Sequence, residues 1–315
     1  MKHSIALLLS LLFLLSSPFF GQIDVSIFNI FDPTKMDYQI FWDLRFPRVV
    51  LAFLVGGILS LSGLVFQTIF RNPMGTPFTL GVASGATLFT AIGILLGFST
   101  FIASFAFAGS LLTIVLLFAL GKRFGGNQTS SLLLVGIALS FFYSASLMIL
   151  FFISNLEESY EIVRFTMGSL DIVGFTNIWL ILIASLALLL VVLRYKKEFH
   201  LLLTSYEFAI LKGVNVKKIN YILLFTVSVA VGICVSIAGP IGFVGLIVPH
   251  IIKIIYQKTA HQLILPIFFY GGIFLVICDF IARNLGSSSD IPIGVVTSFL
   301  GAPFFIYLII KRKKG

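Results

Sequence analysis

Residues 46–68 read FPRVVLAFLVGGILSLSGLVFQT and contain a single charged side chain, Arg48. An α-helix rises about 1.5 Å per residue, so a helix of this length can cross the roughly 30 Å hydrocarbon core of a bilayer. Apolar runs of similar length recur from one end of the chain to the other. The sequence therefore predicts an all-α protein that is solvated mostly by lipid.

The composition supports a membrane protein. Hydrophobic residues make up 59% of the 315 residues and charged residues 10%, whereas soluble domains are about 25% charged. The net charge of +9 does not indicate a nucleic-acid-binding protein, because the basic residues stand singly or in pairs between apolar runs. Cys234 and Cys278 lie within apolar runs without a Cys or His at ligand spacing. We interpret both as packing residues and expect neither a disulfide nor a metal site.

Apolar windows of about twenty residues predict ten membrane spans. With the C-terminal run 311–314 assigned to the cytoplasm, the 21 Lys and Arg residues fall on the cytoplasmic side except Lys35, Arg45, Arg48, Arg164 and Arg283. The expected protein is one multi-pass domain, residues 1–315, in the inner (plasma) membrane with both termini cytoplasmic. The spans are predicted near residues 4–21, 46–68, 79–98, 102–120, 130–153, 176–193, 219–238, 240–256, 262–282 and 292–310.

The first span has an alternative interpretation. Lys2 precedes an apolar stretch that ends at Ser16, Ser17 and Pro18, as in a secretory signal peptide, but no A-x-A-like cleavage site follows. The charge pattern alone is compatible with a retained helix and with a cleaved one.

Motifs for catalysis are absent from the sequence. Neither a G-x-S-x-G nucleophile elbow nor a G-x-x-x-x-G-K-[ST] phosphate loop is present, so the chain is not expected to be an enzyme, and any ATP must be bound by another chain. Asp279 is the only acidic residue well inside a predicted span, and Arg283 follows four positions later. This spacing predicts an ion pair at the outer end of the ninth span. A secondary carrier or uniporter that works without an ATPase remains an alternative.

The longest polar segment on the cytoplasmic side, residues 196–218, contains a short amphipathic pattern from Leu202 to Gly213. Its apolar residues share one helical face, and Gly213 can supply the left-handed residue that ends a helix. The pattern fits a helix that lies on the membrane surface or one that contacts a partner protein.

Five blocks of sequence, in this order, resemble the FecCD family of ABC-transporter permeases, which import iron siderophores, haem and cobalamin. The resemblance covers nearly the whole chain. The blocks are RFPR (45–48), SGLVFQTIFRNP (62–73) followed by LGVASGA (80–86), LKGVNV (211–216), GPIGFVGLIVPH (239–250) and IPIGVVTSFLGAPFF (291–305).

The resemblance implies a type II ABC importer architecture with ten transmembrane helices per subunit. Two such subunits, either two copies of this chain or this chain and a paralogue, would surround a central pathway. Two cytoplasmic ATPases would use ATP, with no cofactor on this chain, and a soluble binding protein would deliver a ferric siderophore, haem or cobalamin. The family retains its N-terminal helix, which favours a retained first span. The absence of a mid-span ligand cluster also fits a wrapped metal better than a bare ion.

The resemblance also implies roles for particular residues. It implies a break near the outer mouth within residues 239–250, a packing or ATPase-facing role for His250, and a pathway lined by the fifth and tenth spans. The remaining expected site residues are Arg45, Arg48 and Arg283 for docking of the binding protein, Glu207, Ala209 and Gly213 for coupling to the ATPase, and Ser140, Ser144 and Thr297 for the pathway, although Ser and Thr hydroxyls in spans often bond their own helix backbone.

Overall fold

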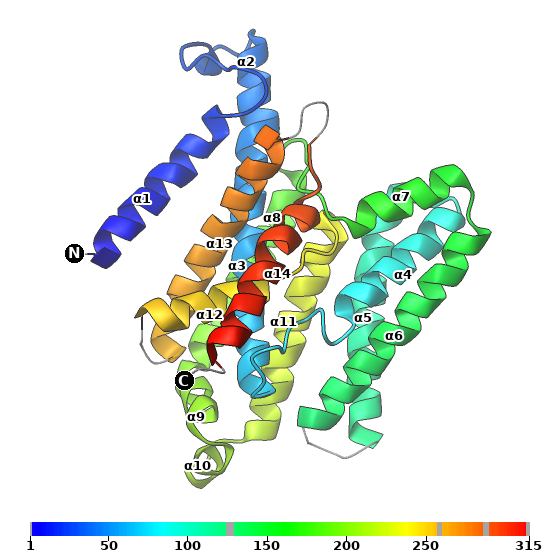
Figure 1. The fold of residues 1–315 in the computed structure, drawn as a ribbon, viewed down its shortest axis with the longest axis vertical. Coiled ribbons are helices and arrows are strands. Elements are labelled where there is room, and N and C mark those ends of the chain that lie inside the picture. Colours follow the sequence, from blue (N-terminus) through cyan, green and yellow to red (C-terminus); the bar gives the residue numbers. More distant parts are fainter. Residues whose placement is uncertain (1, 124–128, 257–259, 286–289, 313–315) are drawn as a thin grey trace.

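The computed structural model describes residues 2–123, 129–256, 260–285 and 290–312, and this part of the chain is helical with no strand (Figure 1). The C-terminal residues 313–315, part of the basic run that we used to orient the chain, lie outside the described residues. The longer apolar helices are α1 (Lys2–Ser16), α3 (Phe46–Ile69), α4 (Val82–Leu95), α5 (Ile102–Arg123), α6 (Thr129–Ile153), α8 (Thr176–Arg194), α11 (Val216–Ala238), α12 (Val244–Tyr256), α13 (Ala260–Leu285) and α14 (Ile293–Arg312).

Short helices connect or extend these elements. They are η1 (Ser17–Phe19), η2 (Asn29–Phe31), α2 (Met36–Gln39), the π-helical turn η3 (Ile40–Arg45) that leads into α3, η4 (Ser99–Phe101), α7 (Leu156–Thr166), α9 (Lys196–Thr204) and α10 (Tyr206–Leu211).

The predicted class, an all-α membrane protein, is confirmed. Among the described residues, six helices are long and apolar enough to cross a bilayer, and they coincide with the spans predicted to begin near residues 46, 102, 130, 176, 219 and 262. Shorter apolar helices coincide with the other four predicted spans. The total of ten spans stays a prediction.

Helix α3 lies at the centre of the larger group of helices (Figure 1). Most of its residues are buried, because α13, α12, α11 and α8 pack around it. A helix that is apolar on every side is stable only when other apolar surface covers it. Glycines allow the closest approaches: a Cβ on Gly56 would lie 2.7 Å from the Cβ of Leu275 in α13, closer than real Cβ contacts. Small residues drive such packing in lipid, where helices gain little from the hydrophobic effect.

Helices α4, α5, α6 and α7 form a second group beside the first (Figure 1). Gly85 and Gly93 of α4 face α5: a Cβ on Gly85 would lie 3.0 Å from the Gly109 carbonyl oxygen, and one on Gly93 would touch the ring of Phe105. The Thr113 hydroxyl bonds the Gly109 carbonyl within α5 at 2.7 Å and lies 3.2 Å from the Tyr143 hydroxyl of α6. Gly85 and Gly93 therefore allow α4 and α5 to approach closely.

Helix α7 lies between two predicted spans and is not among the elements that the sequence predicted. Asn155 caps the helix and forms a reciprocal pair with Glu158: each side chain accepts a hydrogen bond from the backbone N–H of the other residue, both at 2.9 Å. The sequence N-L-E-E contains this capping box, and that signal could have revealed the helix.

The predicted break within residues 239–250 is present. Helix α11 ends at Ala238, Gly239 adopts a positive φ of 68°, and Phe243 has a positive φ of 66° before α12 starts. A positive φ is unfavourable for a bulky residue and is seen where the surrounding packing imposes it. The ring of Phe243 packs against Gly301 of α14, where any Cβ would collide with it.

Both cysteines are buried, Cys234 in α11 and Cys278 in α13. Their predicted role as packing residues is confirmed.

Candidate functional site: a charge cluster and a pair of short polar helices

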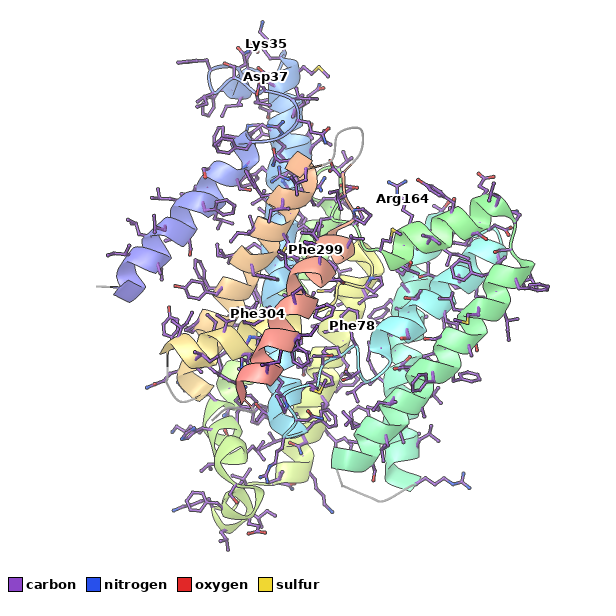
Figure 2. All side chains as sticks on the ribbon, in the orientation of Figure 1. Lys35, Asp37, Phe78, Arg164, Phe299 and Phe304 are labelled. Carbon is purple, nitrogen blue, oxygen red and sulfur yellow. The ribbon has the colours of Figure 1, made fainter. Side chains whose placement is uncertain are left out.

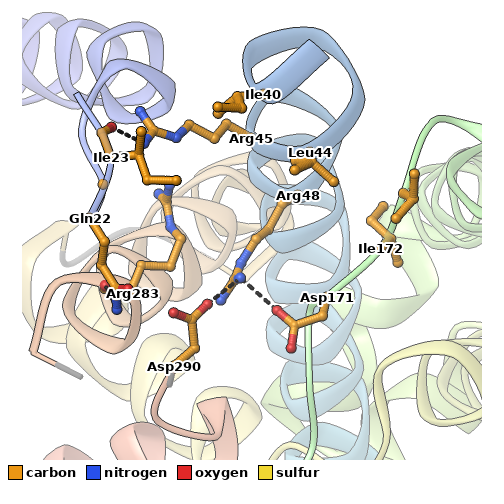
Figure 3. A pocket seen from close by; sticks show the side chains of 12 residues that line it. Gln22, Ile23, Ile40, Leu44, Arg45, Arg48, Asp171, Ile172, Arg283 and Asp290 are labelled. Carbon is orange, nitrogen blue, oxygen red and sulfur yellow. Dashed lines mark hydrogen bonds and ion pairs between the residues drawn. The ribbon is translucent and has the colours of Figure 1, made fainter. Parts of the chain in front are cut away.

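At the end of the bundle where α3 begins, Arg48 is the centre of a cluster of charged side chains (Figure 3). Its Nε donates to Asp279 Oδ1 of α13 at 2.8 Å. Its Nη1 contacts two carboxylates, Asp171 Oδ1 at 2.5 Å and Asp290 Oδ2 at 2.6 Å. One guanidinium therefore joins α3, α13, the segment between α7 and α8, and the segment before α14.

The carboxylates of the cluster differ in exposure. The Asp279 side chain is 0% exposed, whereas those of Asp171 and Asp290 are 48% and 32% exposed. Partly exposed ion pairs contribute about 0–1 kcal/mol each, while removing one member of a buried pair costs roughly 3–5 kcal/mol. The Arg48–Asp279 pair is therefore the stable contact of the cluster, and the other two are readily exchanged.

Arg283 supplies the second cation beside Asp279. Its Nε lies 3.0 Å from Asp279 Oδ2, an ion pair whose geometry falls outside that of a hydrogen bond. This is the i, i+4 pair that the sequence predicted, and it is confirmed. The same guanidinium donates to the carbonyl of Phe20 at 3.3 Å and to the hydroxyl of Ser17 at 3.2 Å. Arg283 therefore also holds the segment that follows α1.

Arg45 is turned toward the same segment and is 8% exposed. Its guanidinium donates to the carbonyl of Phe19 at 3.2 Å and to the carbonyl of Ile23 (Figure 3). A Cβ at Gly21 would lie 2.7 Å from Nη2 of Arg45, so any other residue at this position would require the guanidinium to shift. Of the three arginines singled out from the sequence, Arg45 and Arg283 bind the main chain after α1, and Arg48 does not.

Two hollows flank Arg48. One, of about 350 Å³, is lined by all three arginines together with Asp171 and Asp290 (Figure 3). The other, of about 490 Å³, lies on the side of α7 and is lined by Arg48, Asp171, Asp290 and Arg164 among others. Arg164 is exposed on α7 (Figure 2). A protein side chain that enters either hollow reaches Arg48.

The expected coupling residues lie at the opposite end of the bundle, Glu207 and Ala209 on α10 and Gly213 just after it (Figure 1). The predicted single helix from Leu202 to Gly213 is divided at Ser205, whose hydroxyl accepts a hydrogen bond from the backbone N–H of Phe208 at 3.4 Å and caps α10. Ser competes for backbone hydrogen bonds in this way, and it is favoured at helix N-termini for that reason.

The predicted stop at Gly213 is confirmed, since it has φ +78° and its N–H bonds the Ile210 carbonyl at 2.9 Å. Ala209 is fully buried, while Glu207 is exposed. Leu211 is 83% exposed, and it lies on α10, a short helix that is not one of the long apolar helices. Helix α10 thus presents an acidic and an apolar side chain away from the bundle.

The expected pathway residues are not brought together by contacts with each other. The Ser140 hydroxyl on α6 bonds the Gly136 carbonyl at 2.9 Å, and the buried Thr297 hydroxyl on α14 bonds the Gly294 carbonyl at 3.2 Å. Each hydroxyl therefore bonds the backbone of its own helix, as Ser and Thr hydroxyls in membrane spans often do. Ser144 is exposed on α6. Exposed aromatic side chains lie on the same two helices, with Phe141 at 73% and Phe299 at 78% (Figure 2).

No group of three His, Cys, Asp or Glu side chains that could hold a metal ion was found in the part of the chain that the structure describes. The charge cluster is instead made of arginines and carboxylates. The Asp279 carboxylate is paired with two arginines, so it is not free to bind a coupling ion as in a typical ion-coupled carrier.

The fold is that of a polytopic helical transport protein with one charged end and one end bearing short polar helices. The chain belongs to the FecCD transport family, whose model matches residues 7–311. It is thereby a permease subunit of the ABC importer class, as the resemblance implied.

Individual relatives and a solved structure agree with this family. An iron chelatin transport system permease protein of Helicobacter pylori is 37% identical over 276 residues, 87% of this chain and 83% of the relative. The hemin transport system permease HmuU of Yersinia pestis is 33% identical over 321 residues, 98% and 95% of the two chains. An inward-facing structure assigned to a metal-chelate type ABC transporter aligns with a TM-score of 0.87 at 31% identity, covering 96% of this chain and 97% of that one.

Proposed function

We propose that this chain forms the membrane pathway of an ATP-driven importer for a chelated metal, with a ferric siderophore, haem or cobalamin as cargo. The observation that carries the proposal is the similarity to the hemin permease, which extends over 98% of this chain. The similarity to the iron chelatin permease of H. pylori supports the same class of cargo.

The energy for transport comes from ATPase subunits that contact residues 196–218 on the cytoplasmic side. The exposed Glu207 and Leu211 offer a polar and an apolar contact, and the buried Ala209 fixes α10 against the bundle. A short helix held at both ends, by the Ser205 cap and by Gly213, can transmit a displacement to α11 because it moves as one body. The substrate itself undergoes no chemical change.

The other end of the bundle faces outward in this proposal and receives the binding protein at Arg45, Arg48 and Arg283. Guanidinium groups stay charged and bind carboxylates bidentately, which suits them to an acidic partner surface. The pathway lies between two subunits, beside α6 and α14, with Ser140, Ser144 and Thr297 near it. Both termini are cytoplasmic, and the chain lies in the inner (plasma) membrane.

Uptake by the complete importer tests the cargo. The chain, its ATPase and its binding protein are reconstituted in proteoliposomes and offered a radiolabelled ferric siderophore, haem and cobalamin in separate reactions with ATP. Saturable accumulation of one of them, with the others unable to compete at tenfold excess, is expected. Accumulation of free iron instead of every chelate would contradict the proposed cargo class.

A further inference from the structure

The guanidinium of Arg48 is occupied asymmetrically. Its Nη1 donates hydrogen bonds to both Asp171 and Asp290, and its Nε donates one to Asp279. Among the described residues, Nη2 makes no hydrogen bond or ion pair, although Arg48 borders both hollows. Nη2 of Arg48 is therefore available to a partner, while the neighbouring Nη1 is occupied by the carboxylates of Asp171 and Asp290.

A carboxylate from a partner binds an arginine most strongly through two parallel hydrogen bonds. The Nε edge of Arg48 is taken by the fully buried Asp279, so a bidentate partner has to use Nη1 and Nη2. That edge is available only when Asp171 and Asp290 leave Nη1. Arg45 lines the same hollow as Arg48 and Arg283, so three arginines face three aspartates, and the cluster becomes cationic when Asp171 and Asp290 leave.

Asp171 and Asp290 are the members of the cluster that can leave. Both are partly exposed, and both stand on segments between helices, whereas Asp279 is held within α13. Ser169 already donates to Asp171 Oδ2 at 2.8 Å, so this carboxylate keeps a partner after it leaves Arg48.

The same segments are attached to α14, which borders the proposed pathway, and to α11. The N–H of Gly294, in the first turn of α14, bonds the Met167 carbonyl at 3.0 Å, and the N–H of Ser169 bonds the Ala238 carbonyl, at the end of α11, at 2.9 Å. Asp290 itself lies three residues before α14. Asp171 and Asp290 therefore stand at the junction where these backbone bonds join α11 and α14.

We propose that Asp171 and Asp290 are internal competitors that occupy Arg48 until a carboxylate of the binding protein displaces them, so that docking and loosening of the α11–α14 junction are one event. The inference rests on the proposed function, since it requires a docking protein. It adds two residues to the docking surface and fixes the chemistry of the contact: an acidic side chain of the partner inserted beside Arg48.

The test measures ATPase stimulation by the substrate-loaded binding protein in the importer reconstituted with its ATPase. The double variant Asp171→Asn, Asp290→Asn is expected to lower the binding-protein concentration for half-maximal stimulation at least threefold and to raise basal ATPase activity. The matched control, Asp32→Asn with Glu157→Gln, removes the same charge from one half-buried and one exposed position outside the cluster and is expected to change neither quantity. Asp171→Asn alone should give a smaller shift in the same direction.

An unchanged or increased half-maximal concentration in the double variant would overturn the inference, because it would show that the two aspartates are neutral or that they orient Arg48 for docking. Arg48→Gln separates this result from failure of the docking proposal. If Arg48→Gln abolishes stimulation while the double variant behaves as wild type, only the competition is wrong. If the binding protein also stimulates the Arg48→Gln importer normally, Arg48 is not a docking residue, and both the competition and the docking proposal are wrong.

Discussion

Gly63 of α3 and Gly245 of α12 pass each other with their backbones in contact, and a Cβ at Gly63 would collide with the Gly245 carbonyl. The same carbonyl accepts a hydrogen bond from Gln67 Nε2 at 3.1 Å. These contacts hold the start of α12, directly after the break at residues 239–243, against the central helix. The position of the break thus depends on two glycines that are far apart in the sequence.

Gly63→Ala should destabilise the protein, because the added methyl group forces α3 and α12 apart. Overpacking of this kind costs about 1–3 kcal/mol, or more when the obstacle is backbone. Gly242→Ala is the control, since a Cβ at Gly242 meets no atom within 4 Å. Thermal unfolding of the purified variants in detergent measures the difference. Equal unfolding temperatures for Gly63→Ala and Gly242→Ala would show that α3 and α12 can move apart at Gly63 without loss of stability.

Asp279→Asn should be much more harmful than Asp171→Asn. The first change leaves Arg48 and Arg283 buried beside a neutral amide, at a cost of roughly 3–5 kcal/mol. The second removes a half-exposed pair worth about 0–1 kcal/mol. Loss of helical circular dichroism in rising denaturant compares the two variants. A larger loss for Asp171→Asn would mean that the buried pair does not stabilise this end of the bundle.

Ala209→Pro should uncouple transport from ATP hydrolysis while the chain still inserts into the membrane. The N–H of Ala209 donates to the Ser205 carbonyl at 3.0 Å, and proline removes this donor and clashes with the preceding turn. Ala209→Gly keeps the N–H and should retain most of the transport. Uptake, ATPase activity and recruitment of the ATPase are measured together. Full uptake and full recruitment by Ala209→Pro would rule out the coupling role of α10.

Local patterns in the sequence predict some features of this fold and not others. The apolar runs, the stop at Gly213 and the Asp279–Arg283 pair are local, so spacing along the chain was sufficient to predict them. Helix α7 was also local, but its capping box was overlooked. Arg48 shows the limit, because its partners Asp171 and Asp290 are 123 and 242 residues away. No helical or strand period connects such positions, and only the packing of α3, α8 and α13 brings them together.

Arg48→Glu should account for most of the effect of the triple variant Arg45→Glu, Arg48→Glu, Arg283→Glu on docking. Arg45 and Arg283 are bound to the main chain after α1, so reversing their charge should mainly lower stability. The half-maximal binding-protein concentration for ATPase stimulation is measured at low salt and near physiological salt, where the screening length is about 8 Å. Complementary Glu→Arg changes on the binding protein should restore part of the stimulation that Arg48→Glu loses. Normal stimulation of the triple variant at low salt would exclude docking by all three arginines.

The proposed function requires that this chain transports only when a partner ATPase drives it, and vanadate-sensitive uptake tests this requirement. Proteoliposomes containing this chain with its ATPase and binding protein are compared with proteoliposomes containing this chain alone. The account predicts ATP-dependent accumulation of the chelate against its gradient in the first case, blocked by vanadate, and no accumulation in the second. Uptake by the chain alone, or uptake that an ion gradient drives and vanadate leaves unchanged, would contradict the account and identify a secondary carrier or uniporter.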